Sequence, residues 1–309
     1  MKFVKTIISV FSFQVFQKII RQLNSIILAR SIGPSNLGIF LLFIKISQNI
    51  FTFSEFGMGS SGIYHIRRKL SSKIKVIENS IIFSIIIGVF CSILLFCFRE
   101  SISFHLLDDN SYYVFLLSLL VPLIMISSIL SIIVRGMFRF DIFNIFLIIK
   151  PFTFLILLTT LLIFLKISIL NIIYAHIFAI FISSLWILYK VYGIEKFRLR
   201  FHQKTFLLNL KYGIKNHILK IVLMVFSSIQ VYILKFYTNN EILGQYSVVL
   251  SIIGIIVFIK LSISLVLTPK VSEMPDQSMH HAIARVARNT FFITGKKWNK
   301  VFEVKIIKD

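Results

Sequence analysis

Long apolar stretches alternate with short polar or basic segments along the chain as far as about residue 270. About 20 apolar residues in a helix cross the roughly 30 Å hydrocarbon core of a bilayer, and eight stretches reach this length. They are residues 6–28, 39–58, 79–98, 112–134, 142–165, 167–189, 213–234 and 242–267. The pattern predicts an all-α, polytopic integral membrane protein with about eight transmembrane helices.

The composition favours the same class of protein. Of the 309 residues, 57% are hydrophobic, 15% are charged and 33 are phenylalanine, which is more apolar surface than a soluble domain of this size encloses. A net charge of +22 would indicate nucleic acid as the partner of a soluble protein, but here the basic residues lie between the apolar stretches. Membrane lipids are therefore the expected partners of the basic loops, and no nucleic acid is expected.

The distribution of basic residues predicts the orientation of the chain in the membrane. With the N-terminus in the cytoplasm, 24 of the 34 lysines and arginines fall in cytoplasmic segments, 4 on the opposite side and 6 within the predicted spans. This bias predicts a cytoplasmic N-terminus. Lys18 and Arg21 interrupt the first apolar stretch, so it is expected to remain as a membrane span and not to be a cleavable signal peptide.

A short pattern recurs 206 residues apart. Ile27-Leu28 and Leu37-Gly38 correspond to Ile233-Leu234 and Leu243-Gly244, and such recurrences indicate repeated helical lobes. The repeat predicts a six-helix lobe over 1–206, the first two helices of a second lobe over 207–270, and a polar cytoplasmic tail over 271–309. Two complete lobes need roughly 100 further residues, so the chain is expected to be truncated or frameshifted at its C-terminal end.

Several of these residues carry a family resemblance. The segments "ILARSIGPSNLGIF", "FSEFGMGSSGIYHIRRK", "ILKFYTNNEILGQYSVV" and "LTPKVSE" resemble the polysaccharide and O-antigen flippases of the multidrug/oligosaccharidyl-lipid/polysaccharide (MOP) exporter superfamily. The resemblance implies two six-helix lobes around a central cavity, which by alternating access moves a lipid-linked oligosaccharide outward across the bacterial inner membrane. The family often has an acidic residue where this chain has Gln230 or Val231.

Polar side chains form a stripe on each of the first two predicted spans. At 100° per residue each set shares an arc of about 120° on its helix. The first set is Gln14, Gln17, Lys18, Arg21, Asn24 and Ser25, and the second is Lys45, Gln48, Asn49, Thr52 and Glu55. A charge at the bilayer centre costs about 2.5–3.5 kcal/mol or more, so these side chains should face a hydrated cavity or a partner.

Two interpretations of the stripes remain open. In the first, Lys18 or Lys45 pairs with Glu55 and fixes the packing of the helices. In the second, the excess positive charge binds an anionic ligand such as a pyrophosphate-linked sugar, because lysine and arginine suit phosphate oxygens. The seventh span adds weaker candidates. The predicted cavity residues are Lys18, Arg21, Asn24, Lys45, Asn49, Glu55, Lys220 and Gln230.

Other polar groups in the spans have simpler interpretations. His176 is expected to be a hydrogen-bonded packing residue, and Lys150 is expected to satisfy carbonyls freed by a kink at Pro151. Cys91 and Cys97 are separated by five residues, a spacing that fits core packing and no metal or redox motif. We find no catalytic motif, so we expect neither an enzyme nor a cofactor or metal site.

The predicted function is export of undecaprenyl-pyrophosphate-linked oligosaccharide units for O-antigen, capsule or exopolysaccharide synthesis. Coupling to a proton or sodium gradient, and contacts with a polysaccharide polymerase and chain-length proteins, are further expectations. One alternative is a multidrug or lipid II exporter of the same superfamily. Another is an inactive membrane fragment or scaffold, which substrate binding would distinguish from a transporter.

Overall fold

The computed structural model describes residues 2–164 and 167–254. Contacts divide the chain into two compact units, of which one comprises Met1–Phe11 with Ile252–Asp309 and the other Ser12–Ser251. The eighth predicted span, 242–267, extends past residue 254, and the predicted tail, 271–309, lies wholly outside the described residues. The unit Ser12–Ser251 contains most of the described helices.

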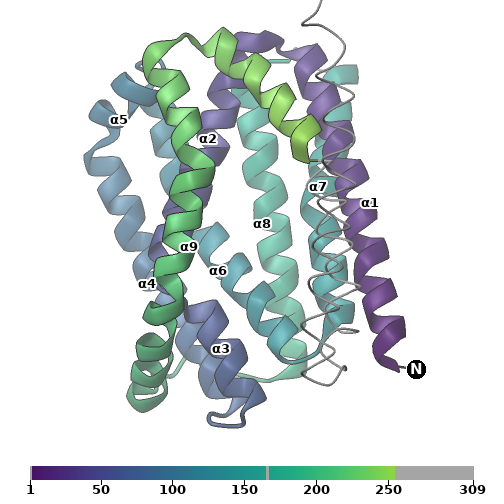
Figure 1. Ribbon diagram of the computed structural model, residues 1–309, viewed down its shortest axis with the longest axis vertical. Coiled ribbons are helices and arrows are strands. Elements are labelled where there is room, and N and C mark those ends of the chain that lie inside the picture. Colours follow the sequence, from purple (N-terminus) through teal and green to yellow (C-terminus); the bar gives the residue numbers. More distant parts are fainter. Residues whose placement is uncertain (1, 165–166, 255–309) are drawn as a thin grey trace, which may run out of the picture. The chain divides into compact units, whose positions relative to one another are not determined.

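Helices account for all the regular structure in the described ranges, and no strand occurs there. In chain order they are α1 (Lys2–Ser31), α2 (Gly33–Ser54), α3 (Met58–Arg67), α4 (Lys73–Cys97), α5 (Arg99–Leu106), α6 (Ser111–Gly136), α7 (Phe140–Phe164), α8 (Ile169–Ile194) and α9 (Gln203–Tyr237). The chain is helical again from residue 240 to 254. Figure 1 shows the long helices running side by side.

Six of the described helices are long and apolar enough to cross a membrane. They are α2, α4, α6, α7, α8 and the His217–Tyr237 part of α9. This confirms the prediction of an all-α, polytopic membrane protein. The 30-residue helix α1 is not among the six, because its polar stripe makes it less apolar than the others.

Several boundaries differ from those predicted. Two short helices, α3 and α5, occupy segments that the apolar pattern left as loops. The turn between α1 and α2 is also much tighter than predicted, because Gly33 adopts a left-handed φ of 72° and Pro34 follows in the first turn of α2. Consequently α2 begins six residues before the predicted start at residue 39.

The core of the unit surrounds α6, which packs against α2, α3, α4, α5, α7 and α8. Leu117, Leu120, Met125 and Ile129 of α6 are fully buried. By contrast, α4 and α7 leave large apolar side chains such as Phe90 and Ile156 exposed. A helix that is apolar on its outer faces as well suits a lipid environment.

The connections lie at two ends of the helix bundle. The α1–α2 turn, α5 and the turn after α9 lie at one end, which we call the α1–α2 end, and α3 lies at the other, the α3 end (Figure 1). The α8–α9 connection, residues 195–202, is extended and is held by α4. Buried Glu78 accepts hydrogen bonds from Arg198 N at 2.7 Å and His202 Nε2 at 2.7 Å. Asn79 exchanges two hydrogen bonds with the His202 backbone, at 2.8 and 2.9 Å.

Candidate functional site

A cavity of about 490 Å³ lies among α1, α2, α7, α8 and the helical residues 240–251. Leucine, isoleucine and phenylalanine side chains form much of its wall. Its polar lining comprises Gln17, Arg21, Asn24, Ser25, Lys45, Gln48, Lys150, His176, Ser247 and Ser251. We call it the cationic cavity, because its charged side chains are Arg21, Lys45 and Lys150.

The three cations of the cavity come from three helices, Arg21 from α1, Lys45 from α2 and Lys150 from α7. The ion pairs found in the described part of the chain involve none of them, and no described carboxylate lines the cavity. Lys45 Nζ lies 3.5 Å from the Ser227 carbonyl oxygen, a weak contact. The cavity therefore carries positive charge that its described protein surroundings leave unneutralised.

Hydrogen bonds hold α1 in position beside this charge. Buried Asn24 donates from Nδ2 to the Pro151 carbonyl oxygen of α7 at 2.9 Å, and the Ser25 and Ser251 hydroxyls lie 2.8 Å apart. Asn24 is three residues after Arg21, and Pro151 follows Lys150, so the first bond joins the turns of α1 and α7 that carry two of the cations. Asn24, predicted as a cavity residue, thus lines the cavity and also joins two helices.

His176 of α8 forms part of the cavity wall between two phenylalanines. Its ring meets the Phe40 and Phe154 rings edge to face, with centroids 5.5 and 5.4 Å apart. His176 is 5% exposed, and its buried Nδ1 has no hydrogen-bond partner in the described structure. The sequence indicated a packing role for His176 and a role at the Pro151 kink for Lys150, and the structure places both at the cavity.

The remaining predicted cavity residues lie elsewhere. Lys18 is half-buried and Gln230 is exposed, and neither lines the cationic cavity. Asn49 belongs to the contact between α2 and α9, where it donates to the Tyr232 hydroxyl at 2.8 Å and accepts from Ser228 at 2.9 Å. The polar stripe of α2 is therefore divided between the cavity and a helix contact.

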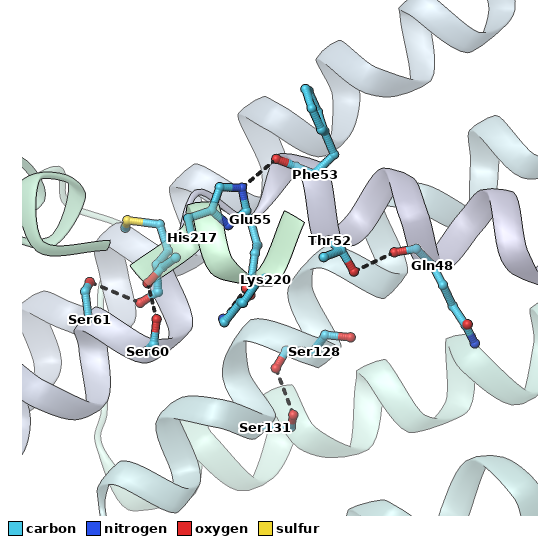
Figure 2. Close-up of polar contacts among 12 residues, drawn as sticks. Gln48, Thr52, Phe53, Glu55, Ser60, Ser61, Ser128, Ser131, His217 and Lys220 are labelled. Carbon is cyan, nitrogen blue, oxygen red and sulfur yellow. Dashed lines mark hydrogen bonds and ion pairs between the residues drawn. The ribbon is translucent and has the colours of Figure 1, made fainter. Parts of the chain in front are cut away.

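Glu55 and Lys220 form an ion pair at the α3 end of α2 and also lie outside the cavity (Figure 2). Glu55 is 2% exposed, so its carboxylate depends on this partner. One turn before Lys220, His217 Nε2 donates to the Phe53 carbonyl oxygen at 3.0 Å. The interpretation in which Glu55 pairs with Lys18 or Lys45 is thus replaced by a contact that joins α2 to α9.

The described helices and the cavity define a multi-pass membrane protein with a charged internal chamber. Residues 3–275 match the family model described as "Polysaccharide biosynthesis protein". The chain therefore belongs to this family, that of the polysaccharide flippases of the MOP exporter superfamily. Comparisons with curated proteins and with solved structures gave no match.

Proposed function

We propose that this protein flips undecaprenyl-pyrophosphate-linked oligosaccharide units across the bacterial inner membrane, for O-antigen, capsule or exopolysaccharide synthesis. The observation that carries the proposal is the convergence of Arg21, Lys45 and Lys150 on one cavity without a described carboxylate. Three such cations within the membrane are costly unless an anion joins them. A pyrophosphate group at the head of a lipid-linked sugar is an anion of the required kind.

The cavity offers different chemistry to the two parts of such a headgroup. The planar guanidinium of Arg21 can bind two phosphate oxygens at once, while Lys45 and Lys150 add point charges. Gln17 and Gln48 present amides that can exchange hydrogen bonds with neutral sugar hydroxyls. Transport then requires the cavity to open to each side of the membrane in turn, with residues 1–206 forming one lobe and the segment from residue 207 onward beginning the second.

Two alternatives make different demands on the cavity. A cationic drug would meet three positive charges there and no described carboxylate, which disfavours multidrug export. Lipid II carries the same pyrophosphate, so only the sugar part of the ligand distinguishes it. In each case the protein acts as a transporter and not as an enzyme, and a polymerase and chain-length proteins would receive its product.

The test is ligand binding to the purified protein in lipid nanodiscs, measured by native mass spectrometry. The ligands are an undecaprenyl-pyrophosphate oligosaccharide, lipid II and a cationic drug. We expect the first to bind most tightly and Arg21→Gln to weaken it about tenfold or more, which corresponds to one charge-assisted contact of about 1.5–3 kcal/mol.

Lys18→Gln is the matched control, because it removes a cation from the same helix outside the cavity wall. Equal loss of binding in the two variants would show that binding depends on the overall positive charge of the protein and not on the position of Arg21 in the cavity wall. Tightest binding of the drug or of lipid II would replace the proposed substrate, and the absence of binding by all three would favour a scaffold.

A further inference from the structure

The helix α2 and the helical residues 240–251 cross with their backbones in contact. A Cβ atom added to Gly38 would overlap the carbonyl oxygen of Asn240, and one added to Gly244 would overlap the carbonyl oxygen of Pro34. Each added atom would also lie 3.1 Å from the backbone nitrogen of the other glycine. Glycine at both positions is what allows this approach.

The crossing is symmetric in sequence. Pro34 and Asn240 are 206 residues apart, and so are Gly38 and Gly244. Each glycine touches the carbonyl four residues before the other glycine, as equivalent surfaces do across a two-fold axis. The glycines of the two recurring Leu-Gly pairs therefore contact each other in the folded structure.

The crossing lies at the edge of the cationic cavity. Leu37, next to Gly38, lines the cavity, and so does Ser247, one turn after Gly244. Both glycines are near the start of their helices, at the α1–α2 end. The contact of the two backbones therefore lies beside the cavity at the α1–α2 end of the bundle.

A polar cluster joins the same two segments. Asp108, in the turn between α5 and α6, accepts from Lys235 Nζ at 2.9 Å and from Asn240 Nδ2. Lys235 Nζ also donates to Asn240 Oδ1 at 2.6 Å. Asn240 is the residue whose carbonyl meets Gly38. The cluster therefore fixes the backbone that forms the crossing, and it does so from the α5–α6 side.

We propose that the Gly38–Gly244 crossing is the gate at the α1–α2 end of the cavity, and that the Asp108–Lys235–Asn240 cluster is its lock. The gate rests on the proposed transport function, because opening the cavity at this end requires the two glycine backbones to separate. A closed state in which two backbones touch leaves no gap for water. Breaking the lock costs a few exchangeable hydrogen bonds, which suits a contact that must open and close.

The gate is tested by labelling a cysteine placed inside the cavity. Cys91 and Cys97 are the chain's two cysteines, and both are first replaced by serine. Gln48→Cys then places a thiol on the cavity wall, away from the crossing. A membrane-impermeant maleimide is added to either face of oriented membrane vesicles, and labelling is quantified by mass spectrometry.

Gly38→Ala and Gly244→Ala should each raise labelling several-fold from the face of the α1–α2 turn, because the added methyl group forces the helices apart. Labelling from the opposite face should not rise. Gly193→Ala is the matched control, since nothing lies within 4 Å of an added Cβ there, and it should leave labelling unchanged.

A third variant adds no volume at the crossing, so it still tests the gate if an alanine variant fails to insert into the membrane. Asp108→Asn removes the charge that holds Lys235 and should raise labelling from the same face, though less than the alanines do. Parental labelling in the inserted Gly38→Ala, Gly244→Ala and Asp108→Asn proteins would overturn the gate. Labelling needs no substrate, so this result would overturn the gate and leave the proposed function standing. Raised labelling in the variants together with a failed binding test would instead overturn the proposed substrate, and would show that the cavity opens at this end.

Discussion

At the scale of the residue, the cavity depends on cations that come from separate parts of the chain. Lys150 shows this most clearly, because its sequence context indicated a local role at Pro151 and the structure places it on the wall of the same cavity as Arg21 and Lys45. Like charges held together within a membrane protein are costly, so their shared cavity has the character of a ligand site.

Lys150→Gln should therefore weaken binding of an undecaprenyl-pyrophosphate oligosaccharide by about tenfold, because one charge-assisted contact of about 1.5–3 kcal/mol is lost. Native mass spectrometry in nanodiscs measures this directly. Thr160→Val is a control on the same helix, where the side chain is exposed and outside the cavity. If Lys150→Gln bound as tightly as the parent protein, Lys150 would return to its local role beside Pro151.

The Glu55–Lys220 pair has a structural role that substitution can isolate. Removing one member of a fully buried pair costs about 3–5 kcal/mol. The Lys220 side chain is 34% exposed, so solvent screening makes the loss smaller here. Lys220→Met should lower the thermal unfolding midpoint, measured in detergent micelles, because the Glu55 carboxylate is then left buried without its partner.

The double variant Glu55→Gln with Lys220→Met should recover part of this loss, since it removes the uncompensated charge. If the double variant were as destabilised as Lys220→Met alone, the packing of the Lys220 stem, and not its charge, would support the contact between α2 and α9. Lys215→Met provides a control on α9, where the lysine is exposed and forms none of the described ion pairs.

At the scale of the element, the extended segment 195–202 is more constrained than a flexible linker. Its Arg198 and His202 backbones are bound to Glu78 and Asn79 at the start of α4. Asn79 is completely buried, so both of its hydrogen bonds are shielded from water. The segment should therefore move with α4, which places any hinge between the six-helix part and α9 after His202.

Asn79→Ala should release this segment, because it removes two hydrogen bonds of about 1 kcal/mol each and leaves the His202 backbone groups without those partners. Faster amide hydrogen exchange over residues 197–203, measured by mass spectrometry, is the expected result. Lys73→Ala is the control, since its pair with Glu195 spans 3.9 Å and the Lys73 side chain is 54% exposed, so the pair is weak. Exchange at the parental rate in Asn79→Ala would show that Asn79 does not hold the extended segment in place.

At the scale of the whole molecule, the basic residues predict how the bundle sits in the membrane. The basic segments 61–78, 135–139 and 190–215 are separated by pairs of long helices, so they meet at the α3 end (Figure 1). Positive charge at that end favours the cytoplasm. The α1–α2 turn, and with it the proposed gate, would then face outward.

Reporter fusions test this orientation. Fusions after residues 75, 138 and 200 should report the cytoplasm, and fusions near residues 105 and 239 should report the opposite side, as the positive-inside bias requires. Paired reporters that are active on opposite sides of the membrane supply the control at each position. A cytoplasmic signal at residue 105 would reverse the orientation and make the proposed gate the inward one.

The sequence by itself determined the class of protein, because runs of about 20 apolar residues have few stable forms other than membrane helices. It also determined that Arg21, Asn24 and Lys45 need polar surroundings, since the face of a single helix follows from its 3.6-residue period. The 206-residue repeat could also be found from the sequence, because it is a recurrence of residue types along the chain.

Only the tertiary structure decided which polar face meets which. Lys45 and Glu55 share one stripe of α2, yet Lys45 lines the cavity and Glu55 pairs with Lys220, because different neighbours cover the two halves of the helix. Lys150 and His176 lie on predominantly apolar helices without a polar stripe like those of α1 and α2, so the sequence pattern did not show the direction of their side chains. Gly38 and Gly244 are 206 positions apart in the sequence, and only the packing of the helices brings them into contact.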